Sequence, residues 1–362
     1  MNNLKVGVII GRFQPVTIEQ IKNLFHPSIS ENDLTVVILG SSDKSRDFRD
    51  PFTWLERASL IRQSLVDMYG RNILTKRGSE TVVMFEPVRD YWYNKTRWLT
   101  SIQDATSESI KVFSQDDVRL SKCSITLYGL NRNDADAEYL NSFPGWTSRV
   151  SERKVRADQS RNVLKTLYAD GYAKESVTDS VRIFLETWKD TEAGQNMRAS
   201  FEHIQKYRLK YDALEKQAGH KLQFMTTDNV VIHLGHILLV RRRSHPGKGL
   251  WALPGGFLEF DETTLTGAKR ELREETGFKV RDEWLVKEGR FDHPTRSARG
   301  RVLTHAFRWE VPSHWNIPQL NPEKGFEQEV TRVKWFPLSE VITDMADQLF
   351  EDHLDIIESL AY

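Results

Sequence analysis

The stretch "GFLEFDETTLTGAKRELREETGF", residues 256–278, combines a helical apolar pattern with a dense group of acidic side chains. On a helix, Glu271 and Glu275 lie one turn apart with Glu274 beside them, whereas Leu272 faces the opposite way into a core. Three carboxylates on one edge repel one another unless a divalent cation joins them, and oxygen ligands suit Mg²⁺ or Mn²⁺. The stretch therefore predicts a metal-binding helix, and the plainer alternative is an acidic, solvated helix face.

The same stretch fits the pattern G-x5-E-x7-R-E-U-x-E-E-x-G-U at every fixed position, where U is a bulky apolar residue. It thereby resembles the signature of the Nudix hydrolases. The resemblance implies that Glu271, Glu274 and Glu275 bind Mg²⁺, with Mn²⁺ as the alternative, and that a diphosphate is split into two monophosphates. The other matched positions are Gly256, Glu262, Arg270, Gly277 and Phe278, of which Gly256 is expected to approach the phosphates and Glu262 and Arg270 to support catalysis.

The region after the acidic helix points to a substrate. "RFDHPTRSARGRVLTHAFRWEV", residues 290–311, resembles the ADP-ribose pyrophosphatase branch, in which a proline follows the signature by a set interval, here Pro294. Phe291 could stack on a base, and neighbouring arginines could neutralise phosphates. The plainer alternative is a connecting loop with solvated arginines. ADP-ribose is therefore the favoured substrate, and the arginines are Arg296, Arg299 and Arg301.

A general base outside the signature is often a glutamate of a later loop in this family. The segment "EKGFEQEV" offers Glu323, Glu327 and Glu329, and the sequence does not choose among them.

The first part of the chain alternates short apolar runs with segments of helical spacing. This alternation predicts a Rossmann-like parallel sheet with helices on both faces. In such folds, ligands bind at the carboxyl ends of the strands. The expected strands are residues 5–10, 34–40, 82–88 and 124–130, and the expected helices are residues 53–65 and 96–106.

The segment "GRFQP", residues 11–15, follows the first expected strand and resembles the nicotinamide mononucleotide adenylyltransferases that are fused to a Nudix domain. The likeness continues through residues 40–61, 85–103, 143–146 and 157–161, and the order of the two domains also agrees. The resemblance implies the synthesis of NAD from ATP and nicotinamide mononucleotide. It also implies substrate contacts from Gly11, Arg12, Phe13, Arg57, Asp90, Trp98 and Arg161, with core packing as the alternative for each aromatic ring.

The family's H-x-G-H turn is altered in this chain. Its positions are occupied by Thr17, Ile18, Glu19 and Gln20. Thr17 and Gln20 can donate neutral hydrogen bonds but carry no positive charge, and Glu19 places a negative charge near incoming phosphates. Transfer of the adenylyl group is therefore doubtful. Later family positions have also changed, with Arg132 in place of a lysine and Asp158 in place of a hydroxyl residue, and Arg156 is a second candidate for the arginine at 161.

The expected organisation is an α/β chain with two functional domains. An adenylyltransferase-like domain spans residues 1–175, a helical connector residues 176–216, and an α+β Nudix sandwich residues 217–362, with a hairpin near Gly235. Lysines plus arginines equal aspartates plus glutamates at 51 each, which argues against nucleic acid or a membrane as a partner. The single cysteine, Cys123, excludes an intrachain disulfide and fits a soluble cytoplasmic protein.

Three functional hypotheses remain at this point. The favoured one is an active Nudix hydrolase joined to an adenylyltransferase-like domain whose transfer activity is doubtful. The second is a fully bifunctional enzyme that also makes NAD. The third is an ADP-ribose-sensing regulator, which would need a DNA-binding helix-turn-helix that the sequence does not show. A homo-oligomer is left open.

Overall fold

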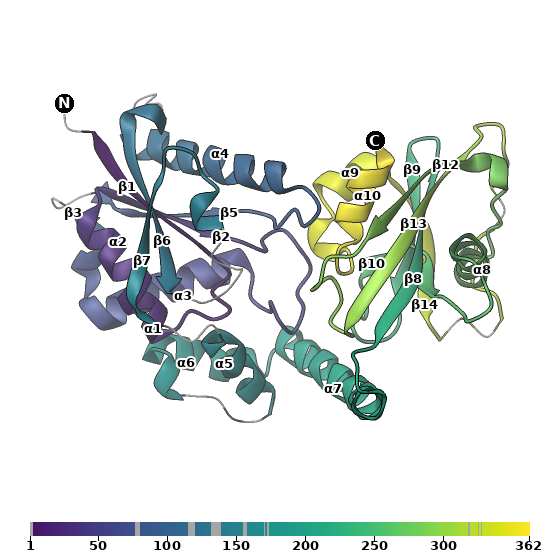
Figure 1. Ribbon diagram of the computed structural model, residues 1–362, viewed down its shortest axis with the longest axis horizontal. Helices are drawn as coiled ribbons and strands as arrows, with labels where there is room; N and C mark the ends of the chain where they lie inside the picture. Colours follow the sequence, from purple (N-terminus) through teal and green to yellow (C-terminus); the bar gives the residue numbers. More distant parts are fainter. Residues whose placement is uncertain are drawn as a thin grey trace. The chain divides into compact units, whose positions relative to one another are not determined.

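The computed structural model describes residues 3–76, 80–114, 120–131, 139–154, 158–169, 171, 174–317, 319–324, 326 and 328–362. The chain divides into two compact units, Met1–Arg198 and Ala199–Tyr362 (Figure 1). The boundary between the units falls inside the segment 176–216 that the sequence predicts as a connector. No helix among the described residues is long and apolar enough to cross a membrane.

The N-terminal unit is built on a parallel sheet of strand order β5-β2-β1-β6-β7. All four strand pairs are parallel, as the alternating pattern predicts. The interior strand β2 is buried along its whole length. The strands are β1 (Leu4–Gly11), β2 (Leu34–Leu39), β5 (Val83–Pro87), β6 (Cys123–Asn131) and β7 (Thr147–Lys154), and β3 (Thr75–Lys76) pairs with β4 (Glu80–Thr81) in a separate ribbon.

Helices cover both faces of this sheet. Val6 and Val8 of β1 pack in one cluster with Ile102 and Ile110 of α4, whereas Gly7, which points the other way, faces the Ser28 hydroxyl of α2. The helices are α1 (Ile18–Gln20), α2 (His26–Glu31), α3 (Trp54–Tyr69), α4 (Lys95–Ser114), α5 (Gln159–Tyr168) and α6 (Asp179–Trp188), with a π-helical segment at Ile21–Phe25.

The C-terminal unit contains a mixed sheet of strand order β10-β9-β8-β13-β12, with β11 paired to β8 and β14 paired to β9. The β8–β13 pair is parallel, and the other pairs are antiparallel. The predicted hairpin is confirmed, because β8 and β9 are joined by Leu234 and Gly235, both at positive φ. The strands are β8 (Gln223–His233), β9 (His236–Arg242), β10 (Trp251–Ala252), β11 (Gly255–Phe257), β12 (Leu285–Phe291), β13 (Arg301–Val311) and β14 (Val330–Pro337).

The acidic stretch forms the helix α8 (Thr264–Thr276), as its spacing predicts. Thr263 caps the first turn by accepting a hydrogen bond from the Thr266 amide, and Gly277 ends the helix in the left-handed conformation. Ala268 and Leu272 pack with Phe307 and Trp309 of β13, which holds the helix against the sheet. The other helices of the chain are α7 (Glu192–Ala218), which crosses the unit boundary, α9 (Leu338–Thr343) and α10 (His353–Ala361).

Candidate functional site

Three acidic side chains of α8, here called the carboxylate cluster, are Glu271, Glu274 and Glu275. All three are buried, with exposed fractions of 7%, 8% and 6%. Carboxylates are rarely buried without partners, because removal from water disfavours their charge. This burial contradicts the plainer alternative of an acidic, solvated helix face.

Arg270 organises the polar side of α8. Its Nη1 donates to Glu271 Oε1 and Glu274 Oε2, each at 2.9 Å. Its Nε and Nη2 donate to the two Glu262 oxygens at 3.0 and 2.6 Å, and Nη2 also donates to the Phe257 carbonyl at 3.1 Å. A planar guanidinium with several fixed partners holds the carboxylates in defined rotamers.

Burial raises the pKa values of two cluster members. It raises the pKa of Glu271 to about 7, against the opposing effect of Arg270. It also raises the pKa of Glu275 well above its usual range, although the Gly255 amide donates to Glu275 Oε2 at 2.9 Å. Buried carboxyl groups with raised pKa values gain most from a nearby cation.

The donor set suits a hard divalent ion, since it consists only of carboxylate oxygens. In the described part of the chain, however, no three acidic, histidine or cysteine side chains already converge as a metal cage. Arg270 Nη1 instead contacts two of the cluster's carboxylates. A divalent ion bound by the cluster would compete with those contacts.

The glycines of the signature are required by close packing. A Cβ at Gly256 would lie 2.6 Å from the Glu271 carboxyl group, and a Cβ at Gly277 would lie 2.8 Å from the Asn321 carbonyl. At either distance an added Cβ would have to displace its neighbour, the Glu271 carboxyl group in one case and the Asn321 backbone in the other. The β11 backbone therefore passes directly over the carboxylate cluster, as expected if it also contacts a phosphate.

The glutamates proposed as a general base differ in their surroundings. Glu329 lies close enough to Glu271 and Glu275 for its charge to raise both of their pKa values. Glu323 instead forms an ion pair with Arg273 at 3.2 Å. Glu327 lies outside the described residues. Of the two described glutamates, Glu329 is therefore the one whose charge acts on both Glu271 and Glu275.

Two of the residues predicted to bind substrate are enclosed. Arg296 is 2% exposed, and its Nε and Nη2 donate to the two Asp352 oxygens at 2.8 Å each. Phe291 is 4% exposed. The structure thus argues against phosphate binding by Arg296, because its guanidinium forms a buried ion pair with Asp352. It also argues against base stacking by Phe291, because that ring is buried in the core.

The other predicted residues of this region are more open. Pro294 is exposed, and Arg301 Nη1 donates to the Asp292 carbonyl at 2.6 Å. Arg299 lies 3.7 Å from the Glu351 carboxylate, and its guanidinium lies 5.1 Å from the centre of the Phe257 ring. Arg299 is therefore the arginine of this loop best placed to meet a ligand beside β11.

Sequence reasoning missed Arg242, the last residue of β9. Burial lowers its pKa to about 10, and its charge interacts with Arg299, Glu351 and Glu275. Its guanidinium lies 4.0 Å from the centre of the Phe350 ring. The three consecutive arginines at 241–243 were the only sign of this residue in the sequence. Which of the three points inward depends on the pairing register of β9, and the sequence does not give that register.

In the N-terminal unit, the altered turn is closed by its own hydrogen bonds. Thr17 and Gln20 form a capping box at α1, with the Thr17 amide donating to Gln20 Oε1 at 2.9 Å. Both residues also reach α5, Thr17 to Gln159 at 3.3 Å and Gln20 to Ser160 at 3.5 Å. They are 1% and 8% exposed. These side chains are therefore engaged in internal contacts.

The other predicted residues of this unit are largely structural. Arg57 is fully buried and donates to the Arg12 and Gly40 carbonyls at 2.8 and 2.7 Å. A Cβ at Gly11 would lie 2.6 Å from the ring of Phe13, which is 5% exposed. This argues against direct substrate contacts from Arg57 and Phe13, because both side chains are buried.

Charged and aromatic groups at the sheet edge remain partly open. Arg12 pairs with Asp90 at 3.3 Å, and its side chain is 46% exposed. Trp98 is half-buried against the core beside Tyr139, at 6.3 Å between ring centres. Arg161 is exposed on α5. Arg132 and Arg156 lie outside the described residues.

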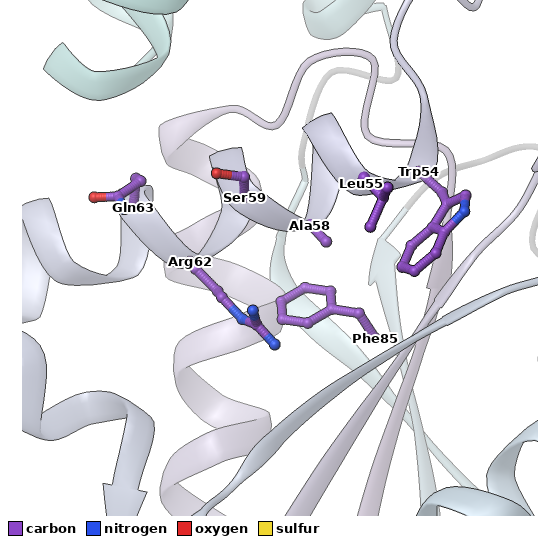
Figure 2. Close-up of a pocket in the computed structure, with 7 residues that line it drawn as sticks. All are labelled: Trp54, Leu55, Ala58, Ser59, Arg62, Gln63 and Phe85. Atoms are coloured by element: carbon purple, nitrogen blue, oxygen red, sulfur yellow. The ribbon is translucent and has the colours of Figure 1, made fainter.

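A surface pocket of about 450 Å³ lies along α3 in the same unit (Figure 2). Figure 2 shows Trp54 and Arg62 of α3 beside Phe85 of β5, and the Arg62 guanidinium lies 4.9 Å from the centre of that ring. None of the predicted site residues lines this pocket, and its lining contains no acidic or histidine side chain. It is therefore separate from the predicted chemistry.

Comparison with known proteins agrees with the two-unit architecture. Residues 223–360 match the model of the NUDIX domain. An ADP-ribose pyrophosphatase of Methanocaldococcus jannaschii is 37% identical over 103 residues, which are 28% of this chain and 60% of that relative. The match thus spans less than two thirds of that relative's length.

Solved structures extend the likeness to the whole chain. The crystal structure of a bifunctional NMN adenylyltransferase/ADP ribose pyrophosphatase from Francisella tularensis has a TM-score of 0.84 and 28% identity, covering 99% of this chain and 98% of that one. A structure described in the same terms from that organism, complexed with AMP and a Mn ion, has a TM-score of 0.83. These matches confirm the predicted fold classes of both domains and their order.

Proposed function

Since residues 223–360 form a Nudix domain, we propose that this chain splits ADP-ribose into AMP and ribose 5-phosphate with the help of a divalent ion, Mg²⁺ first and Mn²⁺ as the alternative. The observation that carries the proposal is the buried carboxylate cluster, of which Arg270 holds Glu271 and Glu274 and the Gly255 amide holds Glu275. The names of the matched relatives support ADP-ribose as the substrate.

Each part of the site has a role in this reaction. Glu271, Glu274 and Glu275 would hold the ion, which supplies Lewis-acid stabilisation of the charge that develops at phosphorus. Arg270 and Glu262 orient the cluster through their hydrogen bonds. Glu329 accepts the proton of the attacking water. Arg242 and Arg299 oppose the negative charge of the diphosphate.

For the N-terminal unit we favour a domain that has lost most adenylyl transfer and can still bind a nucleotide such as ATP or nicotinamide mononucleotide. The closed contacts of Thr17 and Gln20 support this choice over a fully bifunctional enzyme. The intact carboxylate cluster favours hydrolysis over the third hypothesis, an ADP-ribose-sensing regulator. The single cysteine agrees with a cytoplasmic location.

The direct test is to incubate purified protein with Mg²⁺ and ADP-ribose and to separate the products by chromatography. AMP and ribose 5-phosphate should appear in equal amounts. Glu275→Gln should remove this activity while the melting temperature stays near that of the wild type, since glutamine keeps the size of the side chain and the acceptor for the Gly255 amide. If the wild type spares ADP-ribose but cleaves another nucleoside diphosphate derivative, the substrate assignment is wrong.

A further inference from the structure

Four aromatic rings form a continuous row beside the candidate active site. Tyr207 and Tyr211 of α7 lie 4.6 Å apart between ring centres, Tyr211 lies 4.8 Å from Phe224 of β8, and Phe224 lies 5.9 Å from Phe257 of β11. We call these four residues the aromatic wall. All belong to the C-terminal unit.

The wall is not sealed in a core. Phe257, at its end, is 37% exposed, and its contact with Phe224 is edge-to-face, at 78° between the ring planes. The Arg299 guanidinium lies over the same Phe257 ring, and its charge also acts on Tyr207. A partly exposed aromatic ring with a guanidinium over it suits a ligand that is both planar and anionic.

The wall connects to the carboxylate cluster through its neighbours. Phe257 follows Gly256, which lies against the Glu271 carboxyl group, and the Phe257 carbonyl accepts a hydrogen bond from Arg270 at 3.1 Å. Arg242 interacts with both Arg299 and Glu275. Arg299 and Arg242 therefore place positive charge between the wall and the cluster, where the phosphates of a diphosphate would lie if its base stacked on the wall.

We propose that the aromatic wall is the base subsite of this domain, with the base of a nucleoside diphosphate derivative stacked on Phe257 and its phosphates directed past Arg299 and Arg242 toward the carboxylate cluster. The proposal rests on the proposed hydrolytic function and adds the residues that recognise the nucleoside half. It replaces the buried Phe291 as the stacking ring.

A simple packing role is the competing explanation, because aromatic rings also join helices to sheets. The two explanations differ at Phe257. A packing residue at 37% exposure contributes little to binding, whereas base–aromatic stacking is worth about 1–3 kcal/mol, or roughly 5- to 150-fold in affinity. The neighbouring Phe260, at 106% exposure and outside the wall, provides a matched control for removal of a surface phenylalanine.

The test is calorimetric titration of the full chain with AMP, without metal, for the wild type and for Phe257→Ala, Phe257→Trp and Phe260→Ala. Stacking predicts a loss of about 10-fold in AMP affinity for Phe257→Ala, recovery in Phe257→Trp, and near wild-type affinity for Phe260→Ala. Ribose 5-phosphate, which has no base, should bind equally to all four proteins. Melting temperatures report whether each variant is folded.

Steady-state kinetics with ADP-ribose give the second measurement. Phe257→Ala should raise KM by about 10-fold and change kcat little, since the carboxylate cluster is untouched. Equal AMP affinity of the wild type and Phe257→Ala, or no AMP binding by the wild type, overturns the base subsite. The AMP titration does not depend on turnover, so a wild type that binds AMP through Phe257 without cleaving ADP-ribose would refute the hydrolytic function alone.

Discussion

At the scale of single residues, the candidate site is defined by which acids are paired and which are not. Glu262, Glu271 and Glu274 share the guanidinium of Arg270, and Glu323 is paired with Arg273. Glu329 acts on the cluster through its charge. Under the proposed function, Glu329, whose charge reaches the cluster, is a better candidate proton acceptor than Glu323, which is paired with Arg273.

This difference predicts unequal effects of two conservative substitutions. Glu329→Gln should lower kcat for ADP-ribose by roughly 10²- to 10⁴-fold, the usual contribution of a general base. Glu323→Gln should lower kcat by about three-fold at most, because the Arg273 and Glu323 side chains of the ion pair it breaks are each 40% exposed. Single-turnover rates with saturating Mg²⁺ make the comparison. Equal losses in the two variants would remove Glu329 from its assigned role.

Another residue-scale prediction concerns pH and stability. Burial lowers the pKa of His353 from 6.5 to about 3, and its Nδ1 accepts a hydrogen bond from the Leu253 amide at 2.8 Å. Below pH 6.5 His353 binds a proton in the unfolded chain but stays neutral in the folded protein. The contribution of His353 to stability is therefore present above pH 6.5 and is lost as the pH falls toward 3.

Melting temperatures between pH 7.5 and pH 4.5 test this linkage. The wild type should lose stability across the range, and His353→Asn, which keeps an acceptor but cannot ionise, should show a flatter decline. Asp228, a buried neighbour at 3.8 Å from His353 Nε2, is present in both proteins and does not affect the comparison to first order. Parallel pH profiles for the two proteins would show that His353 is not the titrating group.

At the level of secondary-structure elements, β11 and α8 together position the carboxylate cluster. The strand brings its glycine backbone over Glu271 and donates the Gly255 amide to Glu275, and the helix holds Glu271 and Glu274 in place through Arg270. Gly256→Ala should therefore displace the Glu271 side chain and reduce kcat for ADP-ribose by about 10-fold or more, since small misplacements of catalytic groups cost up to about 10²-fold. Gly289→Ala, whose added Cβ would meet only side-chain atoms at 3.3 Å, is the milder comparison. Wild-type kcat in Gly256→Ala would contradict the close approach.

The elements also show what the sequence could and could not predict. The helix at 264–276 and the hairpin at Gly235 were predictable, because their signals are local: residue spacing for one and a glycine turn for the other. The burial of Arg296 was not predictable, because its partner Asp352 lies 56 positions further along the chain and no local sequence pattern indicates the pair. The same holds for the aromatic wall, whose rings come from three separate elements.

At the level of the whole molecule, the two units differ in how fully they match the motifs of the families they resemble. The C-terminal unit has every fixed position of its signature, whereas the N-terminal unit has the parallel sheet and the GRFQP segment but carries Thr17, Ile18, Glu19 and Gln20 where the similar adenylyltransferases carry H-x-G-H. Retention of a fold without its charged groups is physically unsurprising, because the apolar strands stabilise the sheet and the catalytic side chains do not. The full-length match to a bifunctional enzyme therefore supports the architecture of this chain. The adenylyl transfer activity of this chain depends instead on what Thr17 and Gln20 can do.

The altered turn at residues 17–20 predicts slow adenylyl transfer by the N-terminal unit. With ATP, nicotinamide mononucleotide and Mg²⁺, the full chain should form NAD at least about 10²-fold more slowly than a histidine-bearing relative, the scale of losing one preorganised donor. The double variant Thr17→His, Gln20→His should not restore the rate, since Glu19 stays at the turn and the added rings would break the contacts to Gln159 and Ser160. A coupled NAD assay measures both proteins, and calorimetry with ATP reports binding separately. Rapid NAD formation by the wild type would show that neutral donors suffice at this turn, and would make the chain fully bifunctional.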